Sequence, residues 1–260
     1  MSGNSGKPQN VTPYKLGFPQ RDEPGIAQED ESCEVTIDGK AERIRFHDYA
    51  KVYRYPGLYE QIISDELDCR SPKVVVDLLE TQLSQLGDKA PRVFDVGAGN
   101  GIVAEELRRI GVEYIVGCDI LKEAAVAAER DRPGLYSQYL VADLTALPRE
   151  DQARLANADL NCLVIVGALG FGHIPTEAFL AAFGYVAIGG LVGFNVKNEL
   201  LNSGHFSGFA EMIKDLVSNG SMEIVAQKSY RHRLSVTGEP IMYTAFVARK
   251  TAEKPGNSGA

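Results

Sequence analysis

The sequence predicts an α/β fold with a doubly wound, mostly parallel sheet that ends in an antiparallel strand pair. Two observations predict it. From residue 92 onward, apolar segments of strand length alternate with segments of helix length, which is typical of a parallel sheet covered by helices on both faces. Near the C-terminus the alternation stops, because about ten residues containing Gly238-Glu239-Pro240 join the last two strand patterns and leave no room for a crossover helix.

The expected elements follow in order along the chain. Short runs rich in β-branched and apolar residues predict strands over 92–96, 114–118, 138–141, 160–166 and 190–196. Between and after them, the helical periodicity predicts helices over 101–110, 121–131, 148–156, 176–187 and near 207–219. Two final strands, 222–230 and 241–248, should pair antiparallel.

The segment before residue 91 has a different organisation. Residues 1–30 are rich in Gly, Ser, Pro, Asn and Gln, so we expect a disordered tail there and another over 251–260. Residues 31–90 predict a hairpin around Asp38-Gly39, an aromatic-rich short helix that ends at Pro56, and an amphipathic helix that begins at Ser71-Pro72. Residues 91–250 form the main predicted domain.

Composition excludes several classes of protein. The chain has 260 residues and a formal net charge of −8, whereas nucleic-acid-binding domains are normally basic. It contains no apolar run of about 18 residues and no signal pattern, so we expect a cytoplasmic protein that contacts no membrane. The cysteines form no CxxC pair and the four histidines no HxxH pattern, so no metal site is expected.

A glycine-rich turn follows the first strand of the main domain. The sequence Val93-Phe94-Asp95-Val96-Gly97-Ala98-Gly99-Asn100-Gly101 predicts a buried strand, a sharp turn and a helix start. Such a corner is typical of nucleotide binding, because backbone N–H groups and the helix N-terminus face the ligand. The dinucleotide fingerprint would need a third glycine at 102, where this chain has Ile102, so a dehydrogenase is disfavoured.

Three acids recur in phase with this turn. Asp95, Asp119 and Asp143 are spaced 24 residues apart, one strand-helix unit each, which places them at the carboxyl ends of three strands where ligands bind in α/β sheets. A carboxylate after the second strand can accept hydrogen bonds from ribose hydroxyls, and one after the third from the adenine amine. The alternative is that Asp119 and Asp143 only cap the helices that follow them.

The segment from Val93 to Gly101 resembles the first motif of class I S-adenosylmethionine-dependent methyltransferases. The resemblance implies a Rossmann-like seven-stranded sheet with an inserted antiparallel last strand, and S-adenosyl-L-methionine as cofactor with S-adenosyl-L-homocysteine as product. Residues 46–53 and 166–175, with Gly172-His173, are similar to the methyltransferase-like subgroup named for the Williams–Beuren region. The expected cofactor-binding residues are Tyr53, Asp95, Gly97, Ala98, Gly99, Asn100, Gly101, Asp119, Ile120, Asp143, Leu144 and Val166.

The methyl acceptor should lie over the same edge of the sheet, next to the loop from Gly167 to Pro175. In that loop His173 is the candidate general base, with a backbone-orienting role as the alternative. Near that edge, Asn195 and Lys197 could contact the acceptor or be solvated loop residues. The other expected contacts are Phe171 in the loop and His47 and Tyr49 in the aromatic segment, which we predict to be a helical lid.

Several further side chains receive a structural interpretation. Tyr55 and Tyr59 are expected to pack the aromatic segment onto the domain, whereas His205 and His232 are expected at the surface because their neighbours are polar. The predicted function is methyl transfer to an oxygen or nitrogen of a small molecule, for example a natural product. The alternatives are a protein or peptide methyltransferase, and a catalytically silent cofactor-binding subunit.

Overall fold

The computed structural model describes residues 12–19, 26–169, 174–202 and 207–253. Its main body is a seven-stranded sheet in the order β6-β5-β4-β7-β8-β10-β9. The strands are β4 (Arg92–Val96), β5 (Tyr114–Asp119), β6 (Gln138–Val141), β7 (Cys162–Ile165), β8 (Leu191–Lys197), β9 (Met222–Leu234) and β10 (Pro240–Lys250). The strands β4 to β8 are parallel, and β10 lies antiparallel between β8 and β9. The predicted fold class is confirmed.

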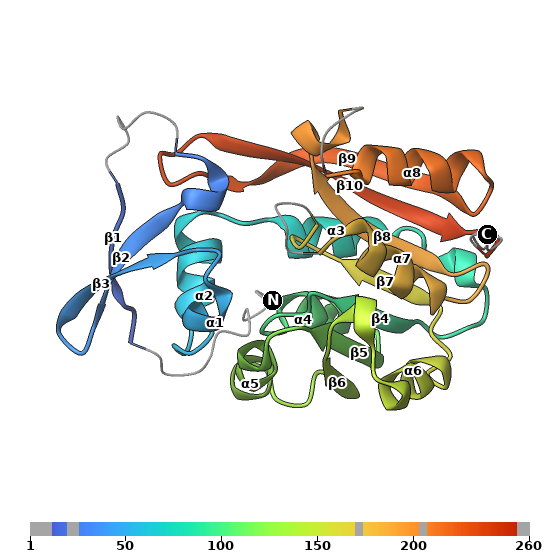
Figure 1. The fold of residues 1–260 in the computed structure, drawn as a ribbon, viewed down its shortest axis with the longest axis horizontal. Coiled ribbons are helices and arrows are strands. Elements are labelled where there is room, and N and C mark those ends of the chain that lie inside the picture. The colour runs from blue at the N-terminus through green and yellow to red at the C-terminus, as the bar shows by residue number, and fades with distance from the viewer. Residues whose placement is uncertain (1–11, 20–25, 170–173, 203–206, 254–260) are drawn as a thin grey trace.

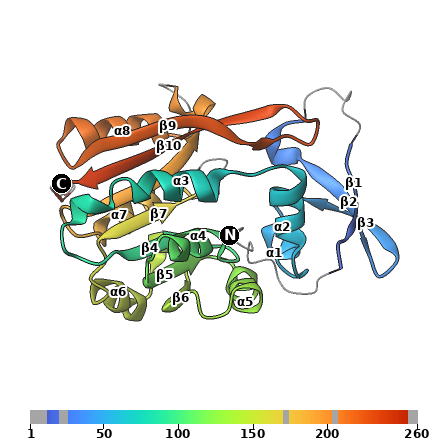
Figure 2. The same ribbon diagram turned by 180° about the vertical axis from the view of Figure 1, so that it is seen from behind.

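Helices cover both faces of this sheet (Figures 1 and 2). On one face lie α3 and α4, and on the other α7 and α8. The helices of the main domain are α3 (Ser71–Glu80), α4 (Ile102–Arg109), α5 (Lys122–Asp131), α6 (Arg149–Ala156), α7 (Thr176–Gly184) and α8 (Phe209–Ser218). Short 3-10 helices at Leu83–Leu86, Leu144–Ala146 and Asn198–Leu201 complete the connections.

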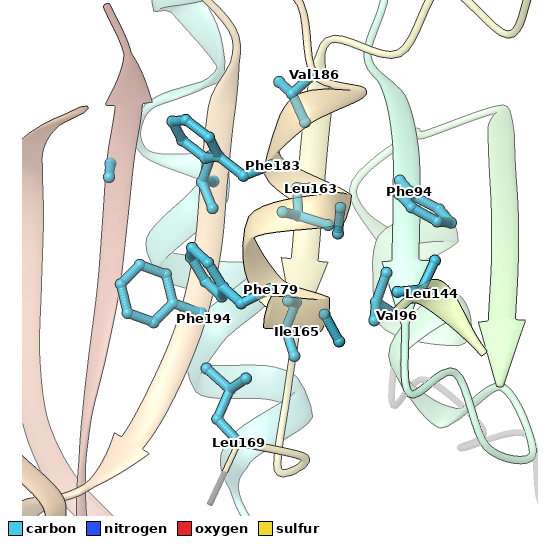
Figure 3. Packing of buried hydrophobic residues seen from close by; sticks show 14 of the residues in the cluster. Phe94, Val96, Leu144, Leu163, Ile165, Leu169, Phe179, Phe183, Val186 and Phe194 are labelled. Atoms are coloured by element: carbon cyan, nitrogen blue, oxygen red, sulfur yellow. The ribbon is translucent and has the colours of Figure 1, made fainter. Parts of the chain in front are cut away.

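Adjacent residues of the central strand β4 supply the cores on the two faces. Phe94 and Val96 belong to the core under α7, whereas Val93 packs with α3 and α4 on the opposite face. Figure 3 shows Phe179 of α7 directed toward Phe194 of β8, with the two ring centroids 5.4 Å apart. Phe183 lies further along the same helix and stacks on Phe179 at 6.4 Å. The strands are apolar on both faces, which holds them between the two layers of helices. Because the five strands β4 to β8 are parallel, their carboxyl ends lie at one edge of the sheet.

A second, three-stranded antiparallel sheet lies beside the main body (Figure 1). Its strands are β1 (Lys15–Gly17), β2 (Ser32–Ile37) and β3 (Lys40–Arg45). The predicted hairpin forms, and both turn residues, Asp38 (φ 50°) and Gly39 (φ 78°), have the positive φ of a two-residue turn. The prediction of a disordered tail over 1–30 is wrong for Lys15–Gly17, which pairs with β2, and for a 3-10 helix at Gln28–Asp30.

One segment carries His47, Tyr49, Tyr53, Tyr55 and Tyr59, and we call it the aromatic segment. It lies between this small sheet and the main sheet (Figures 1 and 2). It begins as α1 (Tyr49–Val52), which ends before Pro56 as expected. The chain then turns at Gly57, with φ 70°, and resumes as α2 (Leu58–Glu60) and a π-helix over Gln61–Glu66, which the sequence did not predict. Arg130 of α5 donates to the carbonyl of Tyr53 at 3.0 Å, which fixes the segment against the main domain.

The far end of the β9–β10 hairpin reaches the small sheet (Figure 1). There Arg233 forms a buried ion pair with Glu31, and the second oxygen of Glu31 accepts from the backbone N–H of Val236 at 2.8 Å. Gln28 also donates to the Tyr243 hydroxyl at 3.3 Å. The long hairpin, the small sheet and the aromatic segment therefore form one connected cover beside the carboxyl edge of the main sheet.

Candidate functional site

The glycine turn between β4 and α4 is tightly enclosed. Gly97, Gly99 and Gly101 have φ values of 69°, 53° and 87°, which favour glycine. A Cβ on Gly97 would lie 2.8 Å from the Cβ of Ala168, and one on Gly99 would lie 2.5 Å from the Tyr53 hydroxyl. The turn therefore passes between the loop after β7 and the aromatic segment with no space for side chains.

Asp119 lies at the end of β5 next to this turn. Its Oδ2 accepts from the backbone N–H of Gly99 and its Oδ1 from that of Leu121, both at 3.0 Å. Burial raises the pKa of Asp119 above its ordinary value. Each carboxylate oxygen has a second lone pair, so both oxygens can still accept from a ligand. Asp119 thus supports the start of α5 and lines a cleft.

Asp143 has a clear capping role. Its Oδ1 accepts from the backbone N–H of Thr145 at 2.8 Å and from the Thr145 hydroxyl at 2.7 Å, which lowers the pKa of this exposed carboxyl. The same residue lines the cleft with Asp119. The cap interpretation therefore describes Asp143 as it stands, while its Oδ2 and the cleft position leave the predicted contact with adenine as a proposal.

Asp95 lies beneath the turn and lines neither of the two cavities described below. Its Oδ2 accepts from the Tyr136 hydroxyl at 2.8 Å, while its Oδ1 is buried and has no hydrogen-bond partner among the described residues. Burial raises the pKa of Asp95 to about 7, against the lowering effect of the Tyr136 hydrogen bond. Asp95 therefore supports the turn as it stands, and the predicted cofactor contact of Asp95 stays a prediction.

Two tyrosines that the sequence interpretation missed support the turn from the same side. Tyr139 donates to the carbonyl of Gly99 at 2.7 Å, and its ring meets that of Tyr136 edge-on at 5.0 Å. A Cβ on Gly117 would lie 2.7 Å from the Tyr136 ring. The signal that could have found them is Gly117, a glycine in the middle of a predicted buried strand, which marks a close approach by a neighbouring group.

A cleft of about 530 Å³ opens over the carboxyl edge of β4, β5, β6 and β7, a volume in the usual range for small-molecule sites. The predicted cofactor residues that line it are Tyr53, Gly97, Asp119, Ile120, Asp143, Leu144 and Val166. Ile120 is 65% exposed at its rim. The structure therefore brings together acids, apolar side chains and the glycine turn from four successive strands.

A smaller chamber of about 70 Å³ lies further in and shares part of this lining. Three more predicted cofactor residues line it, Ala98, Gly99 and Asn100, whereas Gly101 lines neither cavity. The remaining walls come from the aromatic segment, from β9 and β10, and from the start of α3. Among these wall residues are Tyr49, Tyr53, Tyr59, Ser71, His232, Arg233 and Tyr243. We call this space the inner chamber.

The tyrosines shared by the two cavities pack on one another. The rings of Tyr53 and Tyr59 are 5.2 Å apart, and the ring of Tyr49 stacks on Tyr53 at 6.0 Å. Burial raises the pKa of each of the three hydroxyls, so all three are neutral near pH 7. Their faces offer a cation–π contact to a sulfonium of about 0.5–2 kcal/mol. His47 lines both cavities as well.

The two residues of β8 that we expected to contact the acceptor, Asn195 and Lys197, line neither cavity. Asn195 is 1% exposed, and its Oδ1 accepts from the backbone N–H of Gly167 at 2.7 Å. Lys197 pairs with Glu199 and lines neither cavity. The prediction for Asn195 is revised to positioning of the loop after β7. The predicted His173 and Phe171 lie outside the described residues.

The expectation that His232 is a surface residue is wrong. His232 is 7% exposed and lines the inner chamber, because its strand β9 continues past the predicted end at 230. Asn100 differs from expectation too, since its side chain donates to Glu60 at 2.6 Å within a buried group that also contains Arg132. Asn100 therefore connects α2 to the glycine turn through its side chain.

Together, the residues fit S-adenosylmethionine. The carboxylates of Asp119 and Asp143 and the apolar side chains of Ile120 and Leu144 line the cleft next to the glycine turn, and such a lining suits a ligand with hydroxyl and amine donors and a flat ring. Among the described residues, no group of three or more His, Cys, Asp or Glu side chains could hold a metal ion. Within those same ranges, no helix is long and apolar enough to cross a membrane.

Comparisons with known proteins agree with this geometry. Residues 94–161 match the model of a family described as "Methyltransferase domain". A comparison with curated proteins finds no match. Among solved structures, a candidate RNA methyltransferase from Pyrococcus horikoshii is 16% identical and superposes with a TM-score of 0.52, covering 79% of this chain and 89% of that one.

Two further structures show the same fold. An S-adenosylmethionine-dependent methyltransferase from Clostridium acetobutylicum is 12% identical, with a TM-score of 0.51 over 76% of this chain and 98% of that one. A TehB-like S-adenosylmethionine-dependent methyltransferase from Corynebacterium glutamicum is 14% identical, with a TM-score of 0.50 over 79% and 98%. The domain match at residues 94–161 confirms the predicted enzyme class, a methyltransferase, and the solved structures confirm the fold.

Proposed function

We propose that this S-adenosylmethionine-dependent methyltransferase transfers its methyl group to an oxygen or nitrogen of a small molecule whose reacting part enters the inner chamber. The observation that carries the proposal is the enclosure of that chamber, about 70 Å³ between the glycine turn, the three tyrosines and β9. A space of this size beside the glycine turn admits only a small group, which favours in-line transfer.

The cofactor, when bound, supplies a methyl group that its sulfonium already activates. In the proposed arrangement, the turn at Gly97–Gly99 lies against its methionine part, Asp119 accepts from the ribose hydroxyls, and Asp143 accepts from the adenine amine. Ile120 and Leu144 would pack on the two faces of the adenine ring. These assignments keep the predicted roles of the cleft residues and assign Asp95 to support of the turn.

Two alternatives predict different acceptors. A protein or RNA methyltransferase needs an open surface next to the reacting group, whereas here the aromatic segment and the β9–β10 hairpin cover it. The net charge of −8 also opposes RNA. The narrower resemblance to the Williams–Beuren-region subgroup stays part of the proposal, since its Gly172-His173 pair lies outside the described residues.

The test is a transfer assay with labelled S-adenosylmethionine on three sets of acceptors. These are a panel of small hydroxyl and amine compounds, total peptide, and total RNA. The proposal expects label in the small compounds, and less of it in a Gly97→Ala variant. Label only in peptide or RNA would contradict it. Binding of S-adenosylhomocysteine with no transfer to any set would favour the silent subunit.

A further inference from the structure

Four polar side chains form a buried cluster next to the inner chamber. Ser71 begins α3, Asn195 lies on β8, and Tyr230 and His232 lie on β9. Each is at most 8% exposed. Ser71 and His232 also line the chamber. Buried polar groups of this kind need complete hydrogen bonding, so the bonds among them determine where each hydrogen lies.

The orientation of the Asn195 amide follows from one backbone contact. The N–H of Gly167 can only donate, and it lies 2.7 Å from the Asn195 atom that is therefore the oxygen. The amide nitrogen then lies 2.9 Å from the Ser71 hydroxyl and 2.8 Å from the Tyr230 hydroxyl. Both hydroxyl oxygens accept a hydrogen bond from Asn195.

The two hydroxyl hydrogens then have one consistent arrangement. Among the described residues, the Tyr230 hydroxyl has Ser71 as its other hydrogen-bond partner, at 2.6 Å, so Tyr230 donates to Ser71. Ser71 accepts two hydrogen bonds and donates its own hydrogen to Nδ1 of His232, also at 2.6 Å. Nδ1 is thus an acceptor, and the ring proton of neutral His232 lies on Nε2.

The surroundings oppose the charged imidazolium. A proton on Nδ1 would reverse both hydroxyls and leave the buried Tyr230 hydrogen without an acceptor among the described residues. Burial, and next the positive charge of Arg233, hold the pKa of His232 well below its ordinary value. The other groups at the ring are the Cys69 thiol, 3.8 Å from Nδ1, and the Tyr243 ring at 4.2 Å, while Glu31 pairs with Arg233.

A second polar side chain at the chamber is that of Gln28. Gln28 lines the same space, and its Oε1 is buried without a hydrogen bond to any described residue, while its amide nitrogen donates to Tyr243. His232 lines the chamber, and its Nε2–H is the donor that its own hydrogen bonds leave for a ligand. The Gln28 oxygen is fully buried, so a ligand in the chamber does not contact it. A ligand that pairs with His232 must carry an oxygen that accepts a hydrogen bond.

We propose that His232 is a recognition residue for the methyl acceptor, which its fixed Nε2–H selects through a carbonyl or carboxylate oxygen. An ammonium group is disfavoured, because the Nε2–H of His232 cannot accept a hydrogen bond from it. This inference rests on the proposed function, and it removes His232 as a general base. The class of acceptor is thus a compound with a carbonyl or carboxylate oxygen.

The tautomer is tested by nitrogen NMR of protein labelled with ¹⁵N-histidine, with S-adenosylhomocysteine bound. One of the four histidines, assigned by its loss in His232→Gln, should show an unprotonated Nδ1 and a protonated Nε2 from about pH 5.5 to about pH 8.5. Ser71→Ala removes the hydroxyl that donates to Nδ1 and should introduce the Nδ1–H form. Tyr243→Phe, which removes a buried hydroxyl outside this chain, should not. Titration of wild-type His232 near its ordinary pKa would overturn the inference.

The acceptor class is tested in the same samples with two small probes, glycolate and ethanolamine. Glycolate should shift the Nε2–H signal saturably, and ethanolamine should not, whereas the reverse order would contradict the inference. His232→Gln, which keeps an amide N–H near the same position, should retain at least about a third of the glycolate affinity, and His232→Leu should lose about tenfold. A correct tautomer with no transfer to any small molecule would overturn only the proposed function.

Discussion

Asp95 should make the stability of this protein fall as the pH rises from about 4 to about 7. In the folded chain, burial raises the pKa of Asp95 to about 7, against an ordinary value of 3.8. Between these values the unfolded chain releases the proton while the folded chain keeps it, so the free energy of unfolding decreases with pH. At about 1.4 kcal/mol per pH unit, the full effect is about 4 kcal/mol.

The assay compares wild type with Asp95→Asn by urea unfolding at intervals from about pH 4 to about pH 8. The difference in unfolding free energy should move by up to about 4 kcal/mol in favour of the variant across this range. The control is Asp143→Asn, because the pKa of Asp143 is lowered and its contribution changes only below about pH 4. Parallel profiles for wild type and Asp95→Asn would refute the reasoning.

Two further substitutions test the site and its cover. Gly99→Ala should reduce the affinity for S-adenosylhomocysteine at least about tenfold in titration calorimetry. A backbone φ of 53° costs about 1–3 kcal/mol for alanine, and the new Cβ would lie 2.5 Å from the Tyr53 hydroxyl. Unchanged affinity would contradict the close packing around the turn. Glu31→Gln should lower the unfolding free energy by about 3–5 kcal/mol in chemical denaturation, because it leaves Arg233 buried and unpaired. The exposed pair Arg154–Glu150 supplies the control, and Glu150→Gln should cost about 0–1 kcal/mol.

The sequence predicted the parts of the fold that depend on local patterns. Apolar strands such as Val93–Val96 and the glycine turn are encoded in adjacent residues, and β4 and β6 have the predicted bounds. The recurrence at Asp119 and Asp143 placed both acids in the cleft because each strand-helix unit repeats the same length. A short strand such as β1 carries no such pattern, since its three residues are ordered by pairing with β2.

The inner chamber depends on contacts between distant residues. His232 lies between Arg231 and Arg233, and that polar surrounding suggested a surface position. In the fold, Arg233 is buried by its ion pair with Glu31, which is 202 residues away in the chain. Likewise, Asn195 looked like a loop residue, yet its amide joins α3, β9 and the loop after β7. No local pattern predicts such long-range pairing.

The central claim is that the glycine turn and Asp119 hold S-adenosylmethionine, and titration calorimetry with S-adenosylhomocysteine tests it most directly. Wild type and the exposed-site control Asp88→Ala should bind with the same affinity. Asp119→Ala should bind about 10- to 100-fold more weakly, as expected for lost hydrogen bonds to a carboxylate. Equal affinity for Asp119→Ala, or tight NADH binding with no adenosyl ligand bound, would contradict the claim.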